Sequence, residues 1–490
     1  MKLMKRITDI LPGNLLVQTE GNADIAVTSL TFDSRKVEKN SAFFAISGTQ
    51  SDGHSFIDNA IDSGATAIIC EQLPEKINPM VSYFQVQNSS IALGVAASEF
   101  YGNPSEKLTL IGVTGTNGKT TTATLLYRLV NSMGGKAGLF STVCNYIGHK
   151  KVPSTHTTPD AIQLNQLFAE MVEAGCTHCF MEVSSHAIVQ HRTKGLAFKG
   201  GIFTNITHDH LDYHKTFDEY IKAKKLFFDE LPSSAFALTN IDDRNGRVMV
   251  QNTKAKVKTY SLRSMADFKC KIIEQQPIGM LLNIDNIEVW TKLIGEFNAY
   301  NLLCVYSTAQ LLGFDKQEVL TILSNMNPVE GRFEHTQSPN GVVAIVDYAH
   351  TPDALENVIE SIKKIRSEGS KLITVVGAGG NRDKTKRPIM AQIAAQGSEM
   401  VILTSDNPRF EEPEDILNDM KKGIDASSVG RVLTITDRRE AIRTACLLAA
   451  KGDVVLVAGK GHENYQEVKG VKHHFDDKEE IAEIFKTLKP

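Results

Sequence analysis

The stretch that decides the fold is Leu108-Thr-Leu-Ile-Gly-Val-Thr114, which runs directly into Gly115-Thr-Asn-Gly-Lys-Thr120. The first segment is an apolar run typical of a buried strand, and the second is a glycine-bearing loop. Apolar residues then recur at helical spacing from Ala123 to Met133. A strand, a glycine loop and a helix in this order can hold a phosphate group at the amino end of the helix. The sequence therefore predicts an α/β domain with a nucleotide-binding loop.

The loop carries the groups that a phosphate cradle needs. Glycine lets backbone N–H groups approach phosphate oxygens closely, while Lys119 supplies positive charge and Thr120 offers a hydroxyl to Mg²⁺. The strict pattern of such loops would place glycine at Val113, so this motif is a variant. A glycine turn with a solvated lysine is the alternative, which the flanking strand and helix disfavour. The expected phosphate contacts are Gly115, Thr116, Asn117, Gly118, Lys119, Thr120 and Thr121.

The length of the chain indicates several domains. At 490 residues it exceeds what one hydrophobic core supports, and about 150 residues per domain suggests three. Short strand-like runs at 25–32, 42–46 and 65–70 are mixed with helical segments, so the first part is a small α/β module. The expected domains are 1–100, a central domain with a largely parallel sheet at 101–331, and a third domain at 332–490.

The third domain shows four buried-type strands, each followed by a polar or glycine-bearing loop. This pattern is typical of a doubly wound, Rossmann-like sheet, in which loops at the carboxyl ends of the strands line the ligand crevice. We therefore expect the four loops to share one site. The loops are 347–350, 377–382, 406–409 and 459–463.

Composition favours a small-molecule enzyme of the cytoplasm. Lys and Arg together number 53 and Asp and Glu 57, so no strong field of one sign exists to capture nucleic acid or an anionic membrane. Polar residues and glycine interrupt every apolar run well before the roughly 18 residues that a membrane helix needs. The seven scattered cysteines fit reduced, buried thiols better than disulfides or a zinc site.

Two polar residues near strand ends are candidate metal ligands. Glu182 lies at the end of the strand-like run Cys179-Phe-Met-Glu-Val183, one residue before its last, and His210 follows another such run, Gly201-Ile-Phe-Thr-Asn205. A carboxylate and a neutral imidazole could ligate metal beside nucleotide phosphates, and a histidine ligand would point to a second Mg²⁺ site. Taken alone, either residue is more often a satisfied polar group at a sheet edge.

Eight segments together resemble the Mur ligase family, and within it the enzymes that form the UDP-N-acetylmuramoyl tripeptide. The segments occur in the family's order and span most of the chain. They are TGTNGKTTT at 114–122, MEVSSH at 181–186, NITHDHLDYH at 205–214, GRFE at 331–334, DYAHTPDAL at 347–355, GGNRDKTKRP at 379–388, DNPR at 406–409 and GKGHENYQ at 459–466.

The resemblance implies an ATP-dependent ligase that adds meso-diaminopimelate to UDP-N-acetylmuramoyl-L-alanyl-D-glutamate through an acyl phosphate, for peptidoglycan synthesis. It implies a UDP-binding first domain, a central ATPase-type domain and an amino-acid-binding third domain. Phosphorylation gives a poor acyl donor a leaving group, and transfer then depends on positioning and charge neutralisation. A lysine-adding or folylpolyglutamate-type ligase remains the alternative within the class, and a nucleotide-hydrolysing switch remains one outside it.

The resemblance also assigns the metal and ATP sites. It places two Mg²⁺ ions at Thr120, Glu182, His210 and Lys224, with Lys119, Glu182, His210 and Lys224 as the catalytic set. Lys224 would carry a carbamate derived from CO₂, because its Tyr-x-x-Ala-Lys setting matches the family and those of Lys222 and Lys225 do not. From the residues alone, these lysines would form a solvated helix face. Further ATP contacts are Asn298, Asn301, Arg332, Asp347 and His350.

The remaining assignments concern the other two substrates. For the UDP-muramoyl dipeptide they are Ser34, Arg35, Thr49, Gln50, Thr157, Thr158, Ser184, Gln190 and Arg192. For diaminopimelate they are Arg382, Asp406, Asn407, Pro408, Arg409, Gly459 and Glu463. Diaminopimelate carries a distal carboxylate that lysine lacks, so the planar guanidinium of Arg409 can select it by a bidentate contact. Asn381 stands where some members have Asp, which leaves Arg382 intact.

Two expectations concern the whole molecule. The chain is expected to be a monomer that acts on small molecules, without a nucleic-acid partner and without insertion into a membrane. Its domains are expected to close around the substrates, because residues from different domains must meet at one phosphate.

Overall fold

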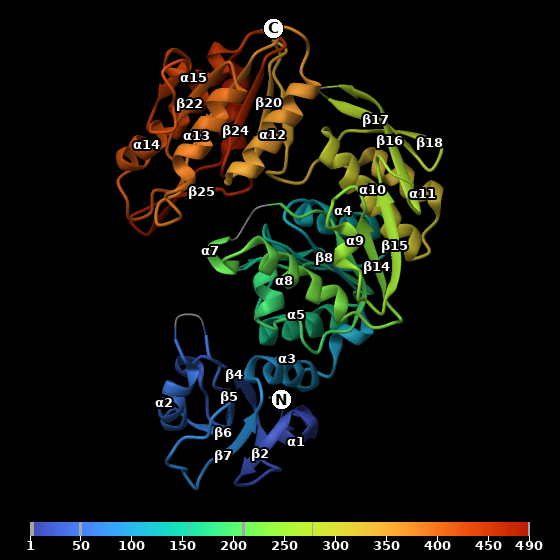
Figure 1. Cartoon of the computed structure of the whole chain (residues 1–490), viewed down its shortest axis with the longest axis vertical. Coiled ribbons are helices and arrows are strands. Elements are labelled where there is room, and N and C mark those ends of the chain that lie inside the picture. Colours follow the sequence, from blue (N-terminus) through green and yellow to red (C-terminus); the bar gives the residue numbers. More distant parts are fainter. Residues whose placement is uncertain (1–3, 49–50, 155, 208–210, 277, 489–490) are drawn as a thin grey trace.

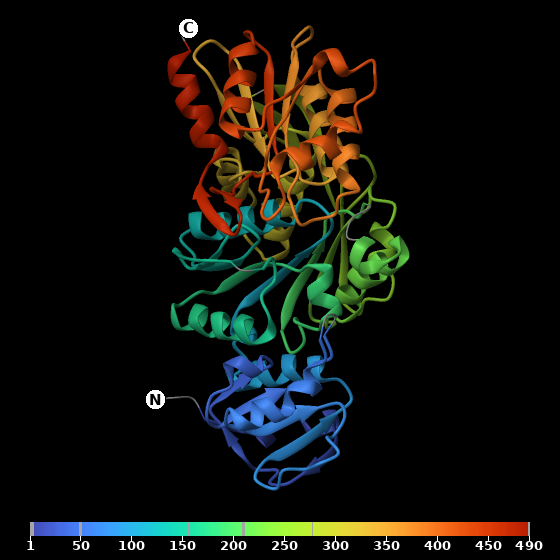
Figure 2. The same cartoon turned by 90° about the vertical axis from the view of Figure 1, so that its left-hand side faces the viewer.

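The computed structural model describes residues 4–48, 51–154, 156–207, 211–276 and 278–488, and the side chains of 211 and 212 are not described. Three α/β units follow one another along the long axis, with the first (blue) at one end and the last (orange to red) at the other (Figures 1 and 2). The predicted α/β class with three units is confirmed. The boundaries at residues 100 and 331 stay a prediction.

The first unit is built on a five-stranded sheet of order β2-β7-β6-β5-β4, parallel except at β2. Its strands are β2 (Leu16–Glu20), β4 (Ser29–Thr31), β5 (Ser41–Phe44), β6 (Ala65–Cys70) and β7 (Ser82–Val86). A separate antiparallel pair is β1 (Lys5–Arg6) with β3 (Ala26–Val27). The helices are α1 (Ile7–Ile10), α2 (Ile57–Asp62) and α3 (Ser89–Phe100), with 3₁₀ turns at Gly13–Leu15, Ser34–Lys36 and Gly53–Phe56.

The central unit is an eleven-stranded sheet of order β11-β10-β9-β12-β8-β13-β14-β15-β16-β17-β18, parallel from β9 to β16 and antiparallel at both edges. The strands are β8 (Thr109–Thr114), β9 (Ala137–Phe140), β10 (Asn145–Ile147), β11 (Lys150–Val152), β12 (His178–Glu182), β13 (Phe198–Phe203), β14 (Phe236–Asn240), β15 (Lys256–Ser261), β16 (Phe268–Gln276), β17 (Gly279–Ile284) and β18 (Ile287–Thr291).

Helices cover both faces of this sheet (Figure 2), and a separate apolar cluster fills each face. They are α4 (Lys119–Ser132), α5 (Ala161–Glu173), α6 (Ser185–Val189), α7 (Leu211–His214), α8 (Phe217–Asp229), α9 (Gly246–Met249), α10 (Glu296–Leu311) and α11 (Lys316–Asn325), after a 3₁₀ turn at Pro104–Lys107. Strand β8 is central and buried, so the loop that follows it opens at the middle of the sheet edge.

The third unit has a six-stranded sheet of order β19-β20-β24-β21-β22-β23, parallel except at β19. The strands are β19 (Glu334–Gln337), β20 (Val343–Asp347), β21 (Leu372–Val376), β22 (Met400–Leu403), β23 (Val432–Thr434) and β24 (Val454–Ala458), with a hairpin of β25 (Tyr465–Val468) and β26 (Val471–His474). The helices are α12 (Pro352–Ile365), α13 (Lys386–Gly397), α14 (Pro413–Lys421), α15 (Arg438–Leu448) and α16 (Asp477–Thr487), with a 3₁₀ turn at Val429–Arg431.

The expected strands match the observed ones within a few residues, with one correction. The run 25–32 is not one strand, because it splits at Thr28 into β3 and β4, which pair with different partners. The run 201–205 ends as a strand at Phe203, which leaves Thr204 and Asn205 available to contact the neighbouring loop.

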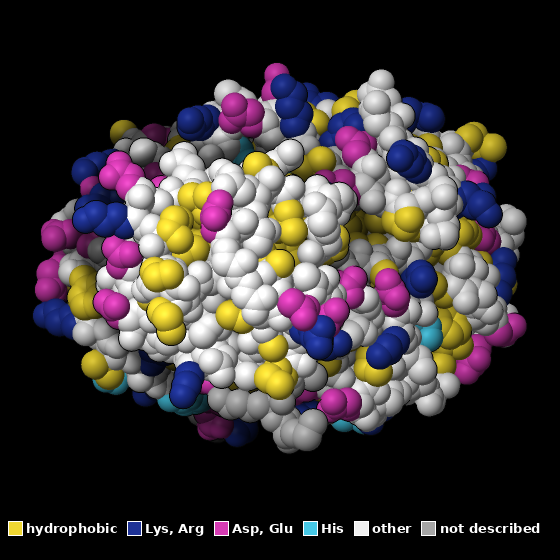
Figure 3. All heavy atoms as spheres, turned by 90° about the horizontal axis from the view of Figure 1, so that it is seen from below, with side chains coloured by type: hydrophobic (Ala, Val, Ile, Leu, Met, Phe, Trp, Pro, Cys, Tyr) yellow, Lys and Arg dark blue, Asp and Glu magenta, His cyan; other side chains and the backbone are white. Residues whose placement is uncertain are grey.

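The surface and the thiols agree with the composition. Side chains of both charge signs are interspersed on the end of the first unit (Figure 3). All seven cysteines are buried and form no disulfide, as expected. Within the described ranges, no helix has both the length and the apolar character required to cross a membrane.

Candidate active site

The loop between β8 and α4 is held in place by the segment that follows β13. Gly115 and Gly118 take left-handed φ angles of 151° and 86°, and a side chain on Gly115 would collide with Thr204. The N–H of Thr116 donates to the carbonyl oxygen of Asn205 (2.8 Å), and the N–H of Asn117 donates to the Asn205 side chain (2.9 Å). The loop therefore needs glycine at 115 and 118, because other residues rarely adopt these φ angles and a side chain at 115 would collide with Thr204.

Two lysines meet at this loop from different helices. Lys119 Nζ donates to the carbonyl oxygens of Gly115 (2.9 Å) and Thr116 (2.7 Å). Lys224 Nζ donates to the Gly115 oxygen as well (2.8 Å) and lies 4.6 Å from the centre of the Tyr220 ring. The Lys224 side chain is buried, whereas Lys222 is exposed. A buried lysine beside a phosphate loop is not the solvated face that the residues alone suggested.

A cluster of oxygen atoms lies at the adjacent strand end. Thr120 Oγ1 donates to Glu182 Oε1 (2.9 Å), and both residues are buried. The N–H of Thr142 donates to the same carboxylate oxygen (2.7 Å), and its hydroxyl donates to Thr157 Oγ1 (3.0 Å). Hydroxyl and carboxylate oxygens suit Mg²⁺, so Thr120 and Glu182 fit the expected metal site.

The structure describes only part of the expected metal site. His210 lies outside the described residues. Within the described ranges, no group of three or more His, Cys, Asp or Glu residues could by itself hold a metal ion. Sequence reasoning did not single out Thr142, which lies in a short segment without a motif of its own.

The residues assigned to the muramoyl dipeptide gather around the same carboxylate strand. Thr158 Oγ1 donates to the backbone oxygen of Glu182 (2.8 Å), and Ser184 caps α6 through the N–H of Ala187 (3.2 Å). Arg192 donates to the Thr158 carbonyl oxygen (2.8 Å) and to Gln190 Oε1 (3.0 Å). With Thr157 these five residues form one polar wall beside Glu182.

The residues assigned to UDP lie in the first unit. Ser34 and Arg35 belong to the 3₁₀ turn after β4, where Arg35 Nε pairs with Asp33 Oδ1 (2.9 Å) and its side chain is 87% exposed. The hydrogen bonds from Arg35 lower the pKa of Asp33, so this carboxylate is ionised and keeps the turn in place. Thr49 and Gln50 lie outside the described residues.

Arg332 brings the third unit to the phosphate loop. Its Nη2 donates to Thr120 Oγ1 (3.2 Å), and its guanidinium carbon lies 4.6 Å from the centre of the Tyr348 ring. Burial raises the pKa of the nearby Asp347 to about 6, although the charge of Arg332 and the N–H of Phe333 oppose the rise. The pairing of Asp347 Oδ2 with that N–H (2.7 Å) orients the turn that carries Arg332.

A second contact between the units was not predicted. Asp353 Oδ2, in the first turn of α12, accepts hydrogen bonds from Thr207 Oγ1 (2.8 Å) and Asn117 Nδ2 (3.3 Å). Its place inside the segment DYAHTPDAL at 347–355 was the available signal. Asp353 therefore fixes the distance between α12 and the phosphate loop.

The other residues assigned to ATP lie at two positions. Asn298 and Asn301 are buried in the first turns of α10, and Asn301 Nδ2 donates to Asn298 Oδ1 (3.1 Å). A side chain on Gly118 would lie 2.6 Å from Asn301 Oδ1, so α10 packs directly against the loop. His350 is exposed, and its Nδ1 is 2.8 Å from the Tyr348 carbonyl oxygen.

The four loops of the third sheet meet as expected. The N–H of Gly459 donates to the Asp347 oxygen (3.0 Å), and Asn407 Nδ2 donates to Glu463 Oε2 (2.7 Å). Burial, and then the charge of Asp406, raise the pKa of Glu463. Lys460, which was not predicted, is fully buried with its Nζ 3.4 Å from the Glu463 carboxylate.

Arg409 lies where two of these loops and the β25–β26 hairpin come together. Its Nη1 donates to the Gly380 oxygen (2.9 Å), and its Nε lies 3.5 Å from Glu467 Oε2. Its backbone φ is 52°, a costly conformation for arginine, and it is held by backbone hydrogen bonds to Glu467 in β25 and to Lys469 in the hairpin turn. Arg382, on the same loop as Gly380, is exposed. Pro408 is buried between Asn407 and Arg409.

The fold and the site define a three-unit α/β protein in which a phosphate loop faces a doubly wound third sheet. Three family models match the chain, described as Mur ligase family, catalytic domain (residues 26–101), Mur ligase middle domain (113–309) and Mur ligase, glutamate ligase domain (331–461). The chain belongs to the Mur ligase family.

Individual relatives match along the whole chain. The UDP-N-acetylmuramoyl-L-alanyl-D-glutamate–2,6-diaminopimelate ligase of Bacteroides fragilis is 59% identical over 485 residues, which is 99% of both chains. The protein of that name from Cytophaga hutchinsonii is 59% identical over 484 residues, again 99% of both. A solved structure of a ligase with the same name has a TM-score of 0.70, 33% identity and 99% coverage of both chains.

Proposed function

We propose that this chain is an ATP-dependent ligase that joins diaminopimelate to UDP-N-acetylmuramoyl-L-alanyl-D-glutamate, in the cytoplasm, as a step of peptidoglycan precursor synthesis. Full-length relatives at 59% identity carry the name of this activity. The single observation that carries the assignment is the position of Arg409, whose guanidinium lies in the loop cluster of the third unit, the unit from which Arg332 contacts Thr120.

The phosphate loop binds the nucleotide in this proposal. Backbone N–H groups at the start of α4 face the phosphates, and Lys119 contributes the mobile positive charge. Thr120 and Glu182 would hold Mg²⁺, which neutralises charge on the phosphates when bound. Arg332 reaches Thr120 from the third unit, so it lies where charge develops on the transferred phosphoryl group.

The chemistry then proceeds in two steps. A substrate carboxylate oxygen attacks the terminal phosphorus, the bond to ADP breaks, and an acyl phosphate forms. The unprotonated amine of the amino acid attacks the acyl carbon, phosphate leaves with the bonding electron pair, and the amine nitrogen gives up one proton to the released phosphate, which leaves the amide. The wall of Thr157, Thr158 and Arg192 positions the carboxylate for the first step, because it adjoins Glu182.

Lys224 supports the metal site as a carbamate in this proposal. Its Nζ is buried beside Gly115. The ammonium would first lose a proton, and the neutral amine would then add CO₂ and release a second proton, which leaves an anionic carbamate whose oxygens suit Mg²⁺ better than a cation does. Lys225 pairs instead with Asp229 (2.6 Å), and Lys222 is exposed, so neither offers a comparable position.

The amino-acid pocket selects its substrate by charge. Arg409 would bind the distal carboxylate of diaminopimelate, and Glu463 with Asn407 would bind the distal amino group. Arg382, Asp406 and the backbone of Gly459 complete the pocket. Lysine has no distal carboxylate, so it would leave Arg409 without an anionic ligand.

The experiment is one coupled assay with matched substrates. Purified chain receives ATP, Mg²⁺ and the UDP-muramoyl dipeptide together with diaminopimelate, lysine or no amino acid, and a parallel reaction offers a folate acceptor with glutamate. We expect phosphate release and a tripeptide product with diaminopimelate. Equal turnover of lysine would contradict the role of Arg409, and phosphate release without any amino acid would favour a nucleotide-hydrolysing switch.

A further inference from the structure

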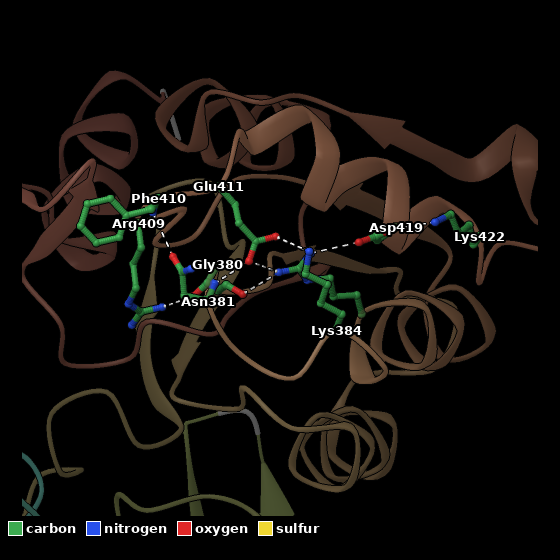
Figure 4. A network of polar contacts seen from close by, with 10 residues as sticks. Gly380, Asn381, Lys384, Arg409, Phe410, Glu411, Asp419 and Lys422 are labelled. Carbon is green, nitrogen blue, oxygen red and sulfur yellow. Dashed lines mark hydrogen bonds and ion pairs between the residues drawn. The ribbon is translucent and has the colours of Figure 1, made fainter. Parts of the chain in front are cut away.

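Arg387 is a buried charge that the proposed chemistry does not use. Its side chain is 0% exposed, and it lies in the first turn of α13. Nη1 pairs with Glu411 Oε2 and with Asp419 Oδ2, and Nη2 pairs with Glu411 Oε1, each at 3.0 Å (Figure 4). A buried guanidinium is costly unless it is paired, and here the contacts of Nη1 and Nη2 supply the pairing while Nε is buried without a hydrogen-bond partner among the described residues.

The ion pair is continuous with the loop that follows β21. Arg387 Nη2 also donates to the Gly379 oxygen (3.3 Å). Glu411 Oε1 accepts the N–H of Asn381 (2.6 Å), and Asn381 Oδ1 accepts the N–H of Phe410 (3.0 Å). The loop at 379–381 and the segment at 409–411 are therefore tied to each other in both directions (Figure 4).

These ties end at the guanidinium of Arg409. Gly380 lies between Gly379 and Asn381, and its carbonyl oxygen accepts a hydrogen bond from Arg409 Nη1 (2.9 Å). Its N–H donates to the Asn407 oxygen (2.9 Å), and a side chain at this position would collide with the Pro408 carbonyl oxygen. Asn381 and Arg409 both have φ near 52°. Such conformations persist only where neighbouring contacts hold them.

Glu411 is the residue through which the ties pass. Hydrogen bonds from Arg387 and from the N–H of Asn381 lower its pKa to about 2, so it is ionised at any pH at which the enzyme would be assayed. Asp419 pairs with the same guanidinium but lies on α14, where its other partner is Lys422 (2.6 Å). Loss of either carboxylate weakens the pairing of Arg387, but only Glu411 also contacts Asn381.

From this geometry we infer that Arg387, Glu411 and Asn381 form a positioning clamp that sets the guanidinium of Arg409 for the amino-acid substrate. The inference rests on the proposed function for the identity of that substrate. None of the three needs to touch the amino acid, because they act through the Gly380 carbonyl and the backbone of Arg409. The clamp makes affinity for diaminopimelate depend on residues outside the pocket.

The test compares Glu411→Gln with Asp419→Asn in the full chain. Both are isosteric, and both remove one charged partner of Arg387. For Glu411→Gln we expect the KM for diaminopimelate to rise about tenfold, as lost hydrogen bonds to charged groups imply, with the KM for ATP within about twofold. For Asp419→Asn we expect both KM values within about twofold of wild type. Equal rises in the two variants would overturn the clamp.

A readout that needs no substrate separates the clamp from the function. Backbone hydrogen exchange at 379–382 is expected to be faster in Glu411→Gln than in Asp419→Asn or wild type. Equal exchange in all three would overturn the clamp whatever the kinetics. If wild type joined no amino acid but exchange at 379–382 was still faster in Glu411→Gln than in the other two proteins, that result would contradict the proposed function. It would still support the role of Glu411 in fixing this loop.

A second variant covers the case in which Glu411→Gln does not fold. Asn381→Gly keeps the left-handed backbone available but removes the acceptor for the Phe410 N–H. Its expected effect is a rise of about threefold in the KM for diaminopimelate, since one neutral hydrogen bond is lost. An unchanged KM together with unchanged exchange at 379–382 would contradict the clamp.

Discussion

In the central sheet, one continuous segment from Gly115 to Thr120 makes most of the phosphate loop, whereas the pocket around Arg409 draws on four loops spread from 347 to 463. The first site is made largely by backbone geometry after one strand. The second is assembled by side chains and ion pairs from several strands. Changes at the first site should therefore reduce turnover with every substrate, and changes at the second should raise the KM for one substrate.

The strongest test of that contrast is Lys119→Ala. Removal of the cation that faces the phosphates should lower kcat by roughly a thousandfold, because charge on the transferred group is no longer neutralised. Steady-state kinetics with each substrate varied in turn would measure it. The exposed Lys222, changed to Ala, is the control and should leave kcat unchanged. If Lys119→Ala left kcat unchanged and altered only the KM for diaminopimelate, the contrast between the two sites would be wrong.

Lys224→Arg should follow with a smaller loss. Arginine keeps the positive charge but cannot form the carbamate, so apparent Mg²⁺ affinity should fall about 10–100-fold, as for other lost supports of a metal site. Activity against Mg²⁺ concentration measures this loss. A carbamate signal from ¹³C-labelled bicarbonate should be present in wild type and in Lys222→Arg, and absent in Lys224→Arg. The idea fails if wild type shows no such signal.

Arg409→Ala tests the second site, the pocket around Arg409. The KM for diaminopimelate should rise about 10–100-fold, because a charge-assisted contact to the distal carboxylate is lost, while the KM for ATP stays within about twofold. Initial rates with both amino acids would also show a smaller preference for diaminopimelate over lysine. An equal rise in the KM for ATP would mean that the two sites are not separable in this way.

The last prediction concerns stability and not turnover, and it is a pH dependence from Asp347, which lies between the two sites. Burial raises its pKa from 3.8 to about 6, so between these values the native state binds more protons than the unfolded chain. The free energy of unfolding should therefore fall as pH rises through this window and show no further loss above it. Asp347→Asn should remove this component. Denaturant unfolding at pH 4, 5, 6 and 7 would measure it, and parallel pH curves for both proteins would contradict it.

The sequence was most informative where neighbouring residues carry the structure. The run 108–114 is a strand because its residues are apolar, and the loop after it follows from two glycines with left-handed φ. Strands β20, β21, β22 and β24 of the third sheet were predicted on the same basis, whereas its edge strands β19 and β23 were not. The run 25–32 was harder to assign, since its split depends on which strands pair with each half.

Contacts between distant residues were less predictable. Thr142 lies outside every recognised motif, whereas Asp353 and Lys460 lie inside two of them but were given no role, and each of the three contacts a predicted site residue. Lys224 could be chosen over its neighbours only by resemblance, although its burial against Gly115 supplies a physical reason. The site assignments and the domain boundaries remain predictions that the variants above can test.

Taken by itself, the sequence determined the α/β class, several buried strands with the loops that follow them, and the chemistry available at each motif, because these depend on local apolar pattern, glycine and side-chain type. The tertiary structure decided which groups meet: Arg332 with Thr120, Asp353 with Asn117, and Glu411 with Asn381. These contacts depend on how whole sheets and helices pack against one another. The number of residues between two positions in the sequence does not give the distance between them in the folded chain.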